Sequence, residues 1–123
     1  GPLFGEQKLQ FWEQIDIFVF PTFHPEGLPY TVLESLASGT PLVTTRVGGI
    51  RDVIFDGVQG LFVEPHDAPG VAAALQRLIE DVKLRQEMSA NCTKRAQEYY
   101  GIDRLSCQFS KLYTEILLNN FNN

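Results

Sequence analysis

The sequence lacks any cluster of positive charge. Its 123 residues carry 10 Lys and Arg against 15 Asp and Glu, for a net charge of -5. The basic residues are scattered, and the best local pair is Lys94-Arg95. A nucleic-acid partner is therefore excluded, because binding to a phosphate backbone needs several basic side chains on one face. Any phosphate that this chain binds must be held by backbone amides or by residues outside the chain.

Cysteine and long apolar runs are scarce as well. The two cysteines, Cys92 and Cys107, lie inside helical patterns and make neither a disulfide framework nor a metal site. Because the sequence also has no Asp-x-Asp pair and no His/Cys cluster, we expect no protein-bound metal. No apolar run approaches the roughly 20 residues that cross a bilayer, and no signal-peptide pattern is recognised. These absences predict a cytoplasmic protein.

An initiator Met is missing, and so is a complete sheet. The chain starts with Gly-Pro-Leu, so we expect either a segment of a longer protein or a Gly1-Pro2 remnant of tag cleavage. Its pattern supplies three strands, whereas a doubly wound sheet usually has five or six. Residues 1–123 are therefore expected to form part of a domain, the second half of a Rossmann-like α/β fold.

Apolar patterning predicts the elements of this half-sheet. Three apolar runs that end near Pro or Gly are expected to be strands, namely Ile15–Phe20, Pro41–Thr45 and Gly60–Val63. The first of them is typical of a strand buried on both faces. Amphipathic or capped stretches predict helices over residues 5–14, 30–38, 50–55, 67–81 and 82–100 and from Asp103, followed by a disordered tail at 119–123. This alternation with short connections predicts a parallel sheet covered by helices.

The loop between the first strand and the next helix predicts an anion site. Pro29 suits the first position of a helix, where its missing N–H is not needed. Gly27 allows the backbone to approach a ligand closely. The N–H groups at the start of the helix would then face a diphosphate above the end of the strand.

Two glutamates, Glu26 and Glu34, flank this loop. The Pro and Gly residues between them exclude a continuous helix, so Glu26 lies on the loop, Glu34 lies on the helix, and the two can converge on one ligand. A carboxylate accepts hydrogen bonds from two neighbouring hydroxyls, as a sugar or a ribose offers. Both have alternatives: Thr31-x-x-Glu34 is the pattern of a capping box, and Glu26 can be a solvated loop acid.

Five further positions are weaker candidates. The amides of Gly48 and Gly49 can contact the ligand or can form only a tight turn. We interpret His24 and His66 as surface or packing residues rather than as an acid or base. Arg46 is interpreted as solvated or paired rather than as a phosphate ligand.

The run PEGLPYTVLESLASGTPLVTTRVGG, residues 25–49, resembles the signature of the group 1 (family 4) retaining glycosyltransferases. The later run DVIFDGVQGLFVEPHD is similar to the family's segment leading into its last strand. The likeness covers most of residues 5–115, and the spaced glutamate pair is its specific part. The resemblance implies the C-terminal, nucleotide-sugar-binding lobe of a two-lobed (GT-B) enzyme.

The resemblance also implies roles for individual residues. Glu26, Gly27 and Leu28 would contact the donor sugar. Tyr30 and Thr31 would approach the diphosphate through their amides, and Glu34 would hold the nucleotide ribose. No residue of this segment is assigned a catalytic role.

The implied reaction transfers a sugar from a nucleotide-diphosphate donor to an acceptor hydroxyl, with retention and with no metal or other cofactor. The acceptor, a glycan, lipid or small molecule, would bind through a missing N-terminal domain, and we expect the fragment to be inactive alone. A peripheral location of the full-length protein at a membrane stays open. The alternatives are a nucleotide-sugar epimerase or hydrolase of the same architecture and a non-enzymatic interaction module.

The first predicted strand also indicates how a half-domain would behave. Its continuous apolar run Ile17–Phe20 is suited to pairing on both edges, and its open edge carries no charge beyond Asp16. We therefore expect the fragment to self-associate as a two-fold dimer.

Overall fold

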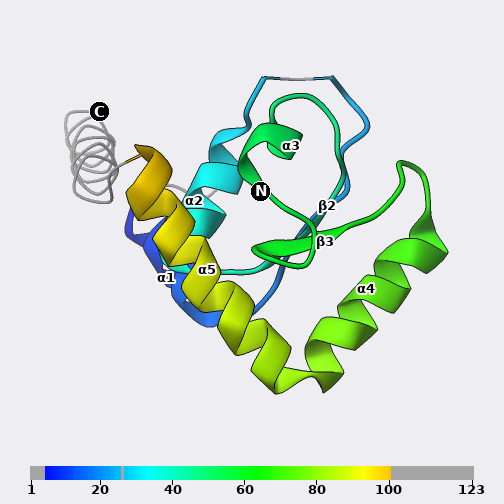
Figure 1. Cartoon of the computed structure of the whole chain (residues 1–123). Helices are drawn as coiled ribbons and strands as arrows, with labels where there is room; N and C mark the ends of the chain where they lie inside the picture. The colour runs from blue at the N-terminus through cyan, green and yellow to red at the C-terminus, as the bar shows by residue number, and fades with distance from the viewer. Residues whose placement is uncertain (1–4, 26, 101–123) are drawn as a thin grey trace.

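The computed structural model describes residues 5–25 and 27–100, which form a small α/β unit (Figure 1). The strands are β1 (Phe18–Phe20), β2 (Leu42–Thr44) and β3 (Gly60–Phe62). The helices are α1 (Glu6–Gln14), α2 (Tyr30–Ser38), α3 (Ile50–Val53), α4 (Ala68–Glu80) and α5 (Val82–Tyr100). The helix predicted from Asp103, the tail predicted at 119–123, and Cys107 lie outside the described residues.

The three strands form one parallel sheet in the order β1-β2-β3. Phe18 is opposite Leu42, which in turn is opposite Gly60. Each strand returns to its neighbour through a helix, which is the connection that parallel strands require. The predicted fold class, a parallel α/β half-sheet with covering helices, is therefore confirmed.

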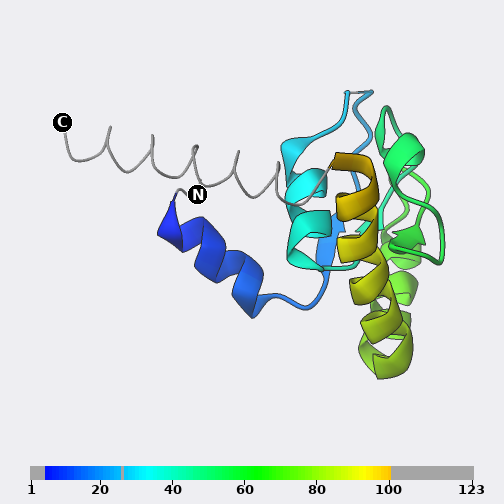
Figure 2. The same cartoon turned by 60° about the vertical axis from the view of Figure 1, so that its left-hand side comes forward.

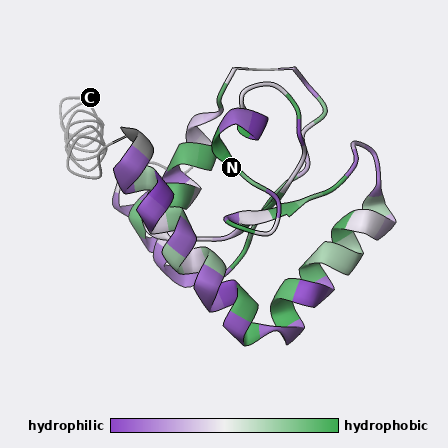
Figure 3. Cartoon of the chain, in the orientation of Figure 1, coloured by the Kyte–Doolittle hydropathy of each residue, from purple (hydrophilic) through white to green (hydrophobic). Residues whose placement is uncertain are grey.

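Successive side chains of the strands point to opposite faces of the sheet and pack into two separate hydrophobic cores. On one face, α2, α3 and α5 bury Val32, Leu36, Leu42, Ile50, Val53, Ile54, Cys92 and Ala96. On the other face, Val43 and Leu61 pack with Leu78 of α4 and Met88 of α5. The long helix α5 contributes to both cores, and its outer surface is mostly hydrophilic (Figure 3).

The first strand departs from its prediction. It is shorter than the predicted run Ile15–Phe20, and all three of its residues are only partly buried, whereas the whole of β2 is buried. The physical reason is its position, because β1 is an edge strand here and has a neighbour on one side only. Two apolar side chains of the helices, Leu9 of α1 and Ile79 of α4, are 47% and 60% exposed.

Two helix ends have caps that suit their residue types. Gly39 ends α2 in the left-handed conformation, with φ of 74°, and its N–H bonds to the last carbonyls of the helix, as expected for glycine in this position. Asp67 caps α4 by accepting a hydrogen bond from the Gly70 N–H at 2.9 Å. In the part of the chain that the structure describes, no helix is long and apolar enough to cross a membrane.

Candidate functional site

The candidate site lies at the carboxyl ends of β1 and β2, where the loops that lead into α2 and α3 meet. Two buried threonines fix the course of the chain after β1. Thr44 donates its hydroxyl to the Phe20 carbonyl at 2.8 Å, and Thr45 donates to the Thr22 carbonyl at 2.6 Å. The loop therefore leaves the sheet in a direction set by β2, toward the start of α2.

The N-terminus of α2 begins directly after this loop. Pro29 is the N-cap and Tyr30 is the first helical residue. The sequence places Pro29 itself at the first helical position, so the helix begins one residue later than that. The side chain of this N-cap residue makes no capping hydrogen bond. Tyr30 is 73% exposed. The amides of Tyr30 and Thr31 therefore begin the helix at a surface that a ligand can reach, where the helix dipole favours an anion.

The Gly48-Gly49 turn lies against the loop of Gly27. Gly49 donates its N–H to the Gly27 carbonyl at 3.0 Å, and a Cβ on Gly49 would lie 3.1 Å from that carbonyl oxygen. Gly48 has φ of 59°, which suits glycine. One of the two candidate amides thus holds the loop in place, and the structure brings Gly49 against Gly27.

Gly27 itself has open space around it. A Cβ built on it would meet nothing within 4 Å among the described atoms. The fold therefore does not demand glycine here, in contrast to Gly49. Glu26 precedes Gly27, and this predicted sugar contact lies outside the described residues.

Glu34 lies in the second turn of α2 with its carboxylate buried, and the residue is 4% exposed. Its Oε2 accepts a hydrogen bond from the Trp12 indole N–H at 3.1 Å. Its Oε1 forms an ion pair with the Lys8 ammonium. The carboxylate therefore faces α1, and the capping box with Thr31 does not form because the N-cap is Pro29.

Neither Lys8 nor Trp12 was predicted to be part of the site. The signal that indicates them is their spacing of four on α1, which places both side chains on one face of that helix. The sequence does not show that this face of α1 contacts Glu34, because Trp12 and Glu34 are 22 positions apart.

The remaining candidates pack at the same edge of the sheet. The His24 and His66 rings both lie against Phe23, with ring centroids 4.2 and 4.5 Å from it. Arg46 is paired with Asp56 at 3.6 Å and lies over the Phe62 ring. These contacts agree with the interpretation of the histidines as packing residues and of Arg46 as a paired surface residue.

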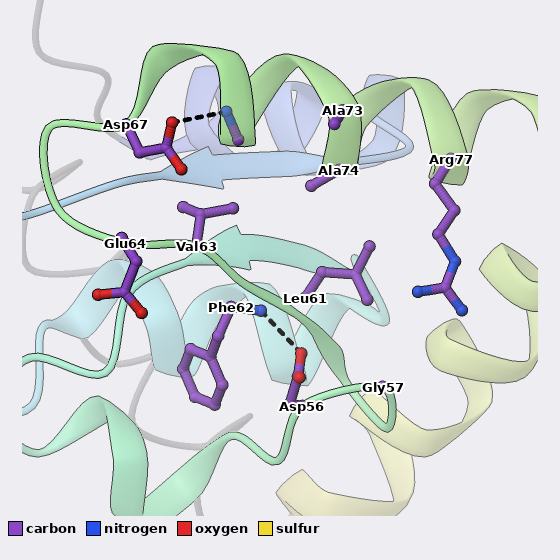
Figure 4. Close-up of a pocket in the computed structure, with 11 residues that line it drawn as sticks. Asp56, Gly57, Leu61, Phe62, Val63, Glu64, Asp67, Ala73, Ala74 and Arg77 are labelled. Carbon is purple, nitrogen blue, oxygen red and sulfur yellow. Dashed lines mark hydrogen bonds between the residues drawn. The ribbon is translucent and has the colours of Figure 1, made fainter.

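A separate groove of about 440 Å³ runs between β3 and α4 (Figure 4). Asp56 lines the lower side of the groove and accepts the Phe62 N–H at 2.9 Å. Arg77 extends into the groove from α4. None of the sequence-predicted site residues lines this groove. Among the described residues, no three His, Cys, Asp or Glu side chains gather as a metal site.

Comparison with known proteins gives curated relatives over most of the chain. The D-inositol 3-phosphate glycosyltransferase of Pseudarthrobacter chlorophenolicus is 36% identical over 96 residues, which are 78% of this chain and 23% of that protein. The capsular polysaccharide biosynthesis glycosyltransferase CapM of Staphylococcus aureus is 30% identical over 109 residues, covering 89% of this chain and 28% of CapM. The chain thus spans less than a third of the length of these relatives.

Solved structures share the fold. The C-terminal domain of the group 1 glycosyl transferase LpcC from Francisella tularensis superposes with a TM-score of 0.71 at 29% identity, covering 81% of this chain and 51% of that chain. Anabaena HepE in complex with UDP superposes with a TM-score of 0.75 at 19% identity, covering 89% of this chain and 30% of HepE. The three-stranded sheet and its helices are those of the C-terminal lobe of a GT-B glycosyltransferase. The family described as "Glycosyl transferases group 1" matches residues 1–81, and the chain belongs to this family.

Proposed function

We propose that this chain is the donor-binding part of a retaining glycosyltransferase. In the full-length protein it would hold a nucleotide-diphosphate sugar whose sugar is transferred to an acceptor hydroxyl. The observation that carries the proposal is the N-terminus of α2, which lies without a side-chain cap at the carboxyl ends of parallel strands. Ligands of open α/β sheets bind at these strand ends, and a helix N-terminus favours phosphate.

Similar proteins support this ligand class. The curated relatives are named as glycosyltransferases, and HepE holds UDP in one crystal structure and UDP-glucose in another. The chain's net charge of -5 also favours backbone amides over basic side chains as the phosphate ligands available within it. We assign the diphosphate to the amides of Tyr30 and Thr31.

The sugar and the ribose would lie on either side of the diphosphate. We assign the sugar hydroxyls to Glu26 and to the backbone of Gly27 and Leu28, and the ribose hydroxyls to Glu34. Gly48 and Gly49 support the Gly27 loop from the other side, through the Gly49 N–H. A carboxylate that accepts from two neighbouring hydroxyls fixes the orientation of the ring that carries them.

The chemical contribution of this segment would be position and charge. When the bond between the sugar and the diphosphate breaks, negative charge develops on the diphosphate, and the amides at the start of α2 would stabilise it. The acceptor would bind through the N-terminal lobe. Residues 1–123 therefore form part of a donor-binding domain that is inactive alone.

Gly27→Ala tests the site without disturbing the fold. Because a Cβ at Gly27 meets nothing within 4 Å, we expect the free energy of unfolding to change by no more than about 0.5 kcal/mol. The added methyl group would separate the loop from the donor, and we expect the affinity for donor to fall about tenfold, roughly 1.4 kcal/mol.

The measurement is calorimetric titration of UDP-, GDP- and ADP-sugars into the longer protein that carries this segment. Thermal unfolding of the same samples is the control for the fold. Unchanged affinity for the donor that binds best would remove Gly27 from the site. A 123-residue chain that binds a donor with a Kd below about 10 μM, roughly -7 kcal/mol, would show that the segment needs no second lobe.

A further inference from the structure

The Glu34 carboxylate is held by α1, and its two oxygens are held differently. Oε2 accepts a directed hydrogen bond from the Trp12 indole at 3.1 Å. Oε1 has the Lys8 ammonium beside it but accepts no hydrogen bond of good geometry from the described residues. A buried carboxylate oxygen in this state keeps acceptor capacity that a hydroxyl group can use.

The two partners differ in how firmly they are held. Trp12 is 8% exposed, and its ring lies edge-on against Phe11 and Phe18, with centroid distances of 5.2 and 5.1 Å. The indole is therefore anchored to β1 through Phe18. The Lys8 side chain is 25% exposed, sits on a flexible stem and comes from the first half of α1. Figure 2 shows α1 at one side of the molecule. A lysine of this kind can move its ammonium to water at low cost.

We infer that Trp12 is a positioning residue for Glu34 and that Lys8 occupies the place of the ribose hydroxyls until a nucleotide binds. This inference rests on the proposed function, since it concerns the ribose end of the donor site. Without nucleotide, Lys8 neutralises a carboxylate that would otherwise be buried and unpaired. On binding, the ribose hydroxyls donate to Oε1 and displace the ammonium, while Trp12 keeps Oε2 in place. A carboxylate already fixed by Trp12 loses little rotamer freedom when it receives the ribose.

The chain's single tryptophan gives a direct readout. In an isotope-labelled 123-residue chain, one indole N–H resonance reports the Trp12–Glu34 bond, and NMR detects binding that is too weak for calorimetry. We would titrate UDP, GDP and ADP, each beside its dideoxy analogue, which lacks both ribose hydroxyls. We expect the indole resonance to move with the ribonucleotide that binds and to stay in place with its dideoxy analogue.

Variants separate the two roles. Lys8→Met removes the competing ammonium, and we expect the affinity for the ribonucleotide to rise by about fivefold, the equivalent of one hydrogen bond, with no change for the dideoxy analogue. Trp12→Phe frees the carboxylate, and we expect the ribonucleotide affinity, followed by phosphorus NMR of the ligand, to fall by a similar factor. Glu34→Gln is expected to reduce the preference for the ribonucleotide. Lys94→Met is the matched control, because Lys94 is exposed and is paired with the exposed Glu98 at 4.0 Å.

The outcomes are distinct. If no nucleotide moves the backbone amides of Gly27, Leu28, Tyr30 and Thr31, the proposed function fails and the inference fails with it. If those amides move but the dideoxy analogue binds equally well and the indole resonance does not respond, the inference alone is wrong. Lys8→Met that lowers stability and leaves the affinity unchanged would make the Lys8–Glu34 pair a purely structural contact. The wild-type indole titration decides the question even if a variant fails to fold.

Discussion

The thiol of Cys92 shows how one buried side chain links the helices to the sheet. It is fully buried on α5 and lies 3.4 Å from the Gln59 carbonyl oxygen and 3.7 Å from that of Thr40. The Thr40 carbonyl also accepts the Ser35 hydroxyl at 2.6 Å. Burial raises the pKa of the Cys92 thiol from its ordinary 9.0 to about 12. Cys92 is therefore a protonated packing residue, as the sequence predicts for a thiol within a helical pattern.

This pKa predicts a loss of stability at high pH. Between pH 9 and about 12 the unfolded chain releases the thiol proton while the folded chain keeps it. The thiol's contribution to stability is therefore complete below pH 9 and declines as the pH rises through this window, by at most about 1.4 kcal/mol per pH unit. Urea unfolding of the wild type and of Cys92→Ala across this window is the measurement.

Other groups also titrate at these pH values. The quantity to compare between the two proteins is therefore the slope of the free energy of unfolding against pH. We expect Cys92→Ala to be less stable at neutral pH, because it leaves a cavity, and to lose less stability than the wild type as the pH rises. Parallel pH profiles for the two proteins would show that the thiol titrates normally in the folded state.

Glu34 shows what can and cannot be predicted for a single residue. Its spacing from Glu26 marks it as unusual, and the pattern Thr31-x-x-Glu34 offers a local explanation. That explanation fails because α2 begins at Tyr30, which makes Thr31 the second helical residue, whereas a capping box needs Thr at the N-cap. The partners that Glu34 has instead, Lys8 and Trp12, lie on another helix. Periodicity places residues on a helix face but does not say what that face contacts.

The fourth helix is the clearest case of an element encoded by its own sequence. Asp67 accepts the Gly70 N–H at 2.9 Å, and Pro69 occupies the first turn. Leu78 of this helix is fully buried, while the next residue, Ile79, is 60% exposed. The start of the helix is a local property and was predicted, whereas the side chains that it buries depend on how the helix lies on the sheet.

The cap of α4 can be tested directly. Asp67→Ala removes the acceptor for the Gly70 N–H, and we expect it to lower the free energy of unfolding by about 1 kcal/mol. Asp67→Ser keeps a side-chain acceptor at the N-cap and should cost only a few tenths of that. The midpoints of urea unfolding measure both. Equal losses for Ser and Ala would mean that the hydrogen bond is not the source of the stability.

The two outer edges of the sheet differ in whether their backbone groups are hydrogen-bonded. At the outer edge of β3, Asp56 accepts the Phe62 N–H at 2.9 Å and the Gly57 N–H donates to the Gly60 carbonyl at 2.8 Å. At β1 the Phe18 N–H donates inward, to the Pro41 carbonyl at 2.9 Å. Because successive peptide groups of a strand alternate in direction, those of Val19 face the outer edge. Only part of each residue in β1 is buried.

We therefore expect the 123-residue chain to dimerise through β1, with two copies of the strand pairing antiparallel across a two-fold axis. An open strand edge next to partly exposed Phe and Val side chains is a template for another strand. Light scattering after gel filtration, over a range of micromolar concentrations, is the measurement, and the expected mass is twice 13.9 kDa.

Val19→Pro removes an outward N–H that an edge strand can do without and should shift the mass toward the monomer. Ile79→Lys is the control, because it replaces an apolar side chain on another element, where Ile79 of α4 is 60% exposed. A dimer that survives Val19→Pro but is lost in Ile79→Lys would place the contact on α4. A monomer at every concentration would mean that the β1 edge is protected within one chain.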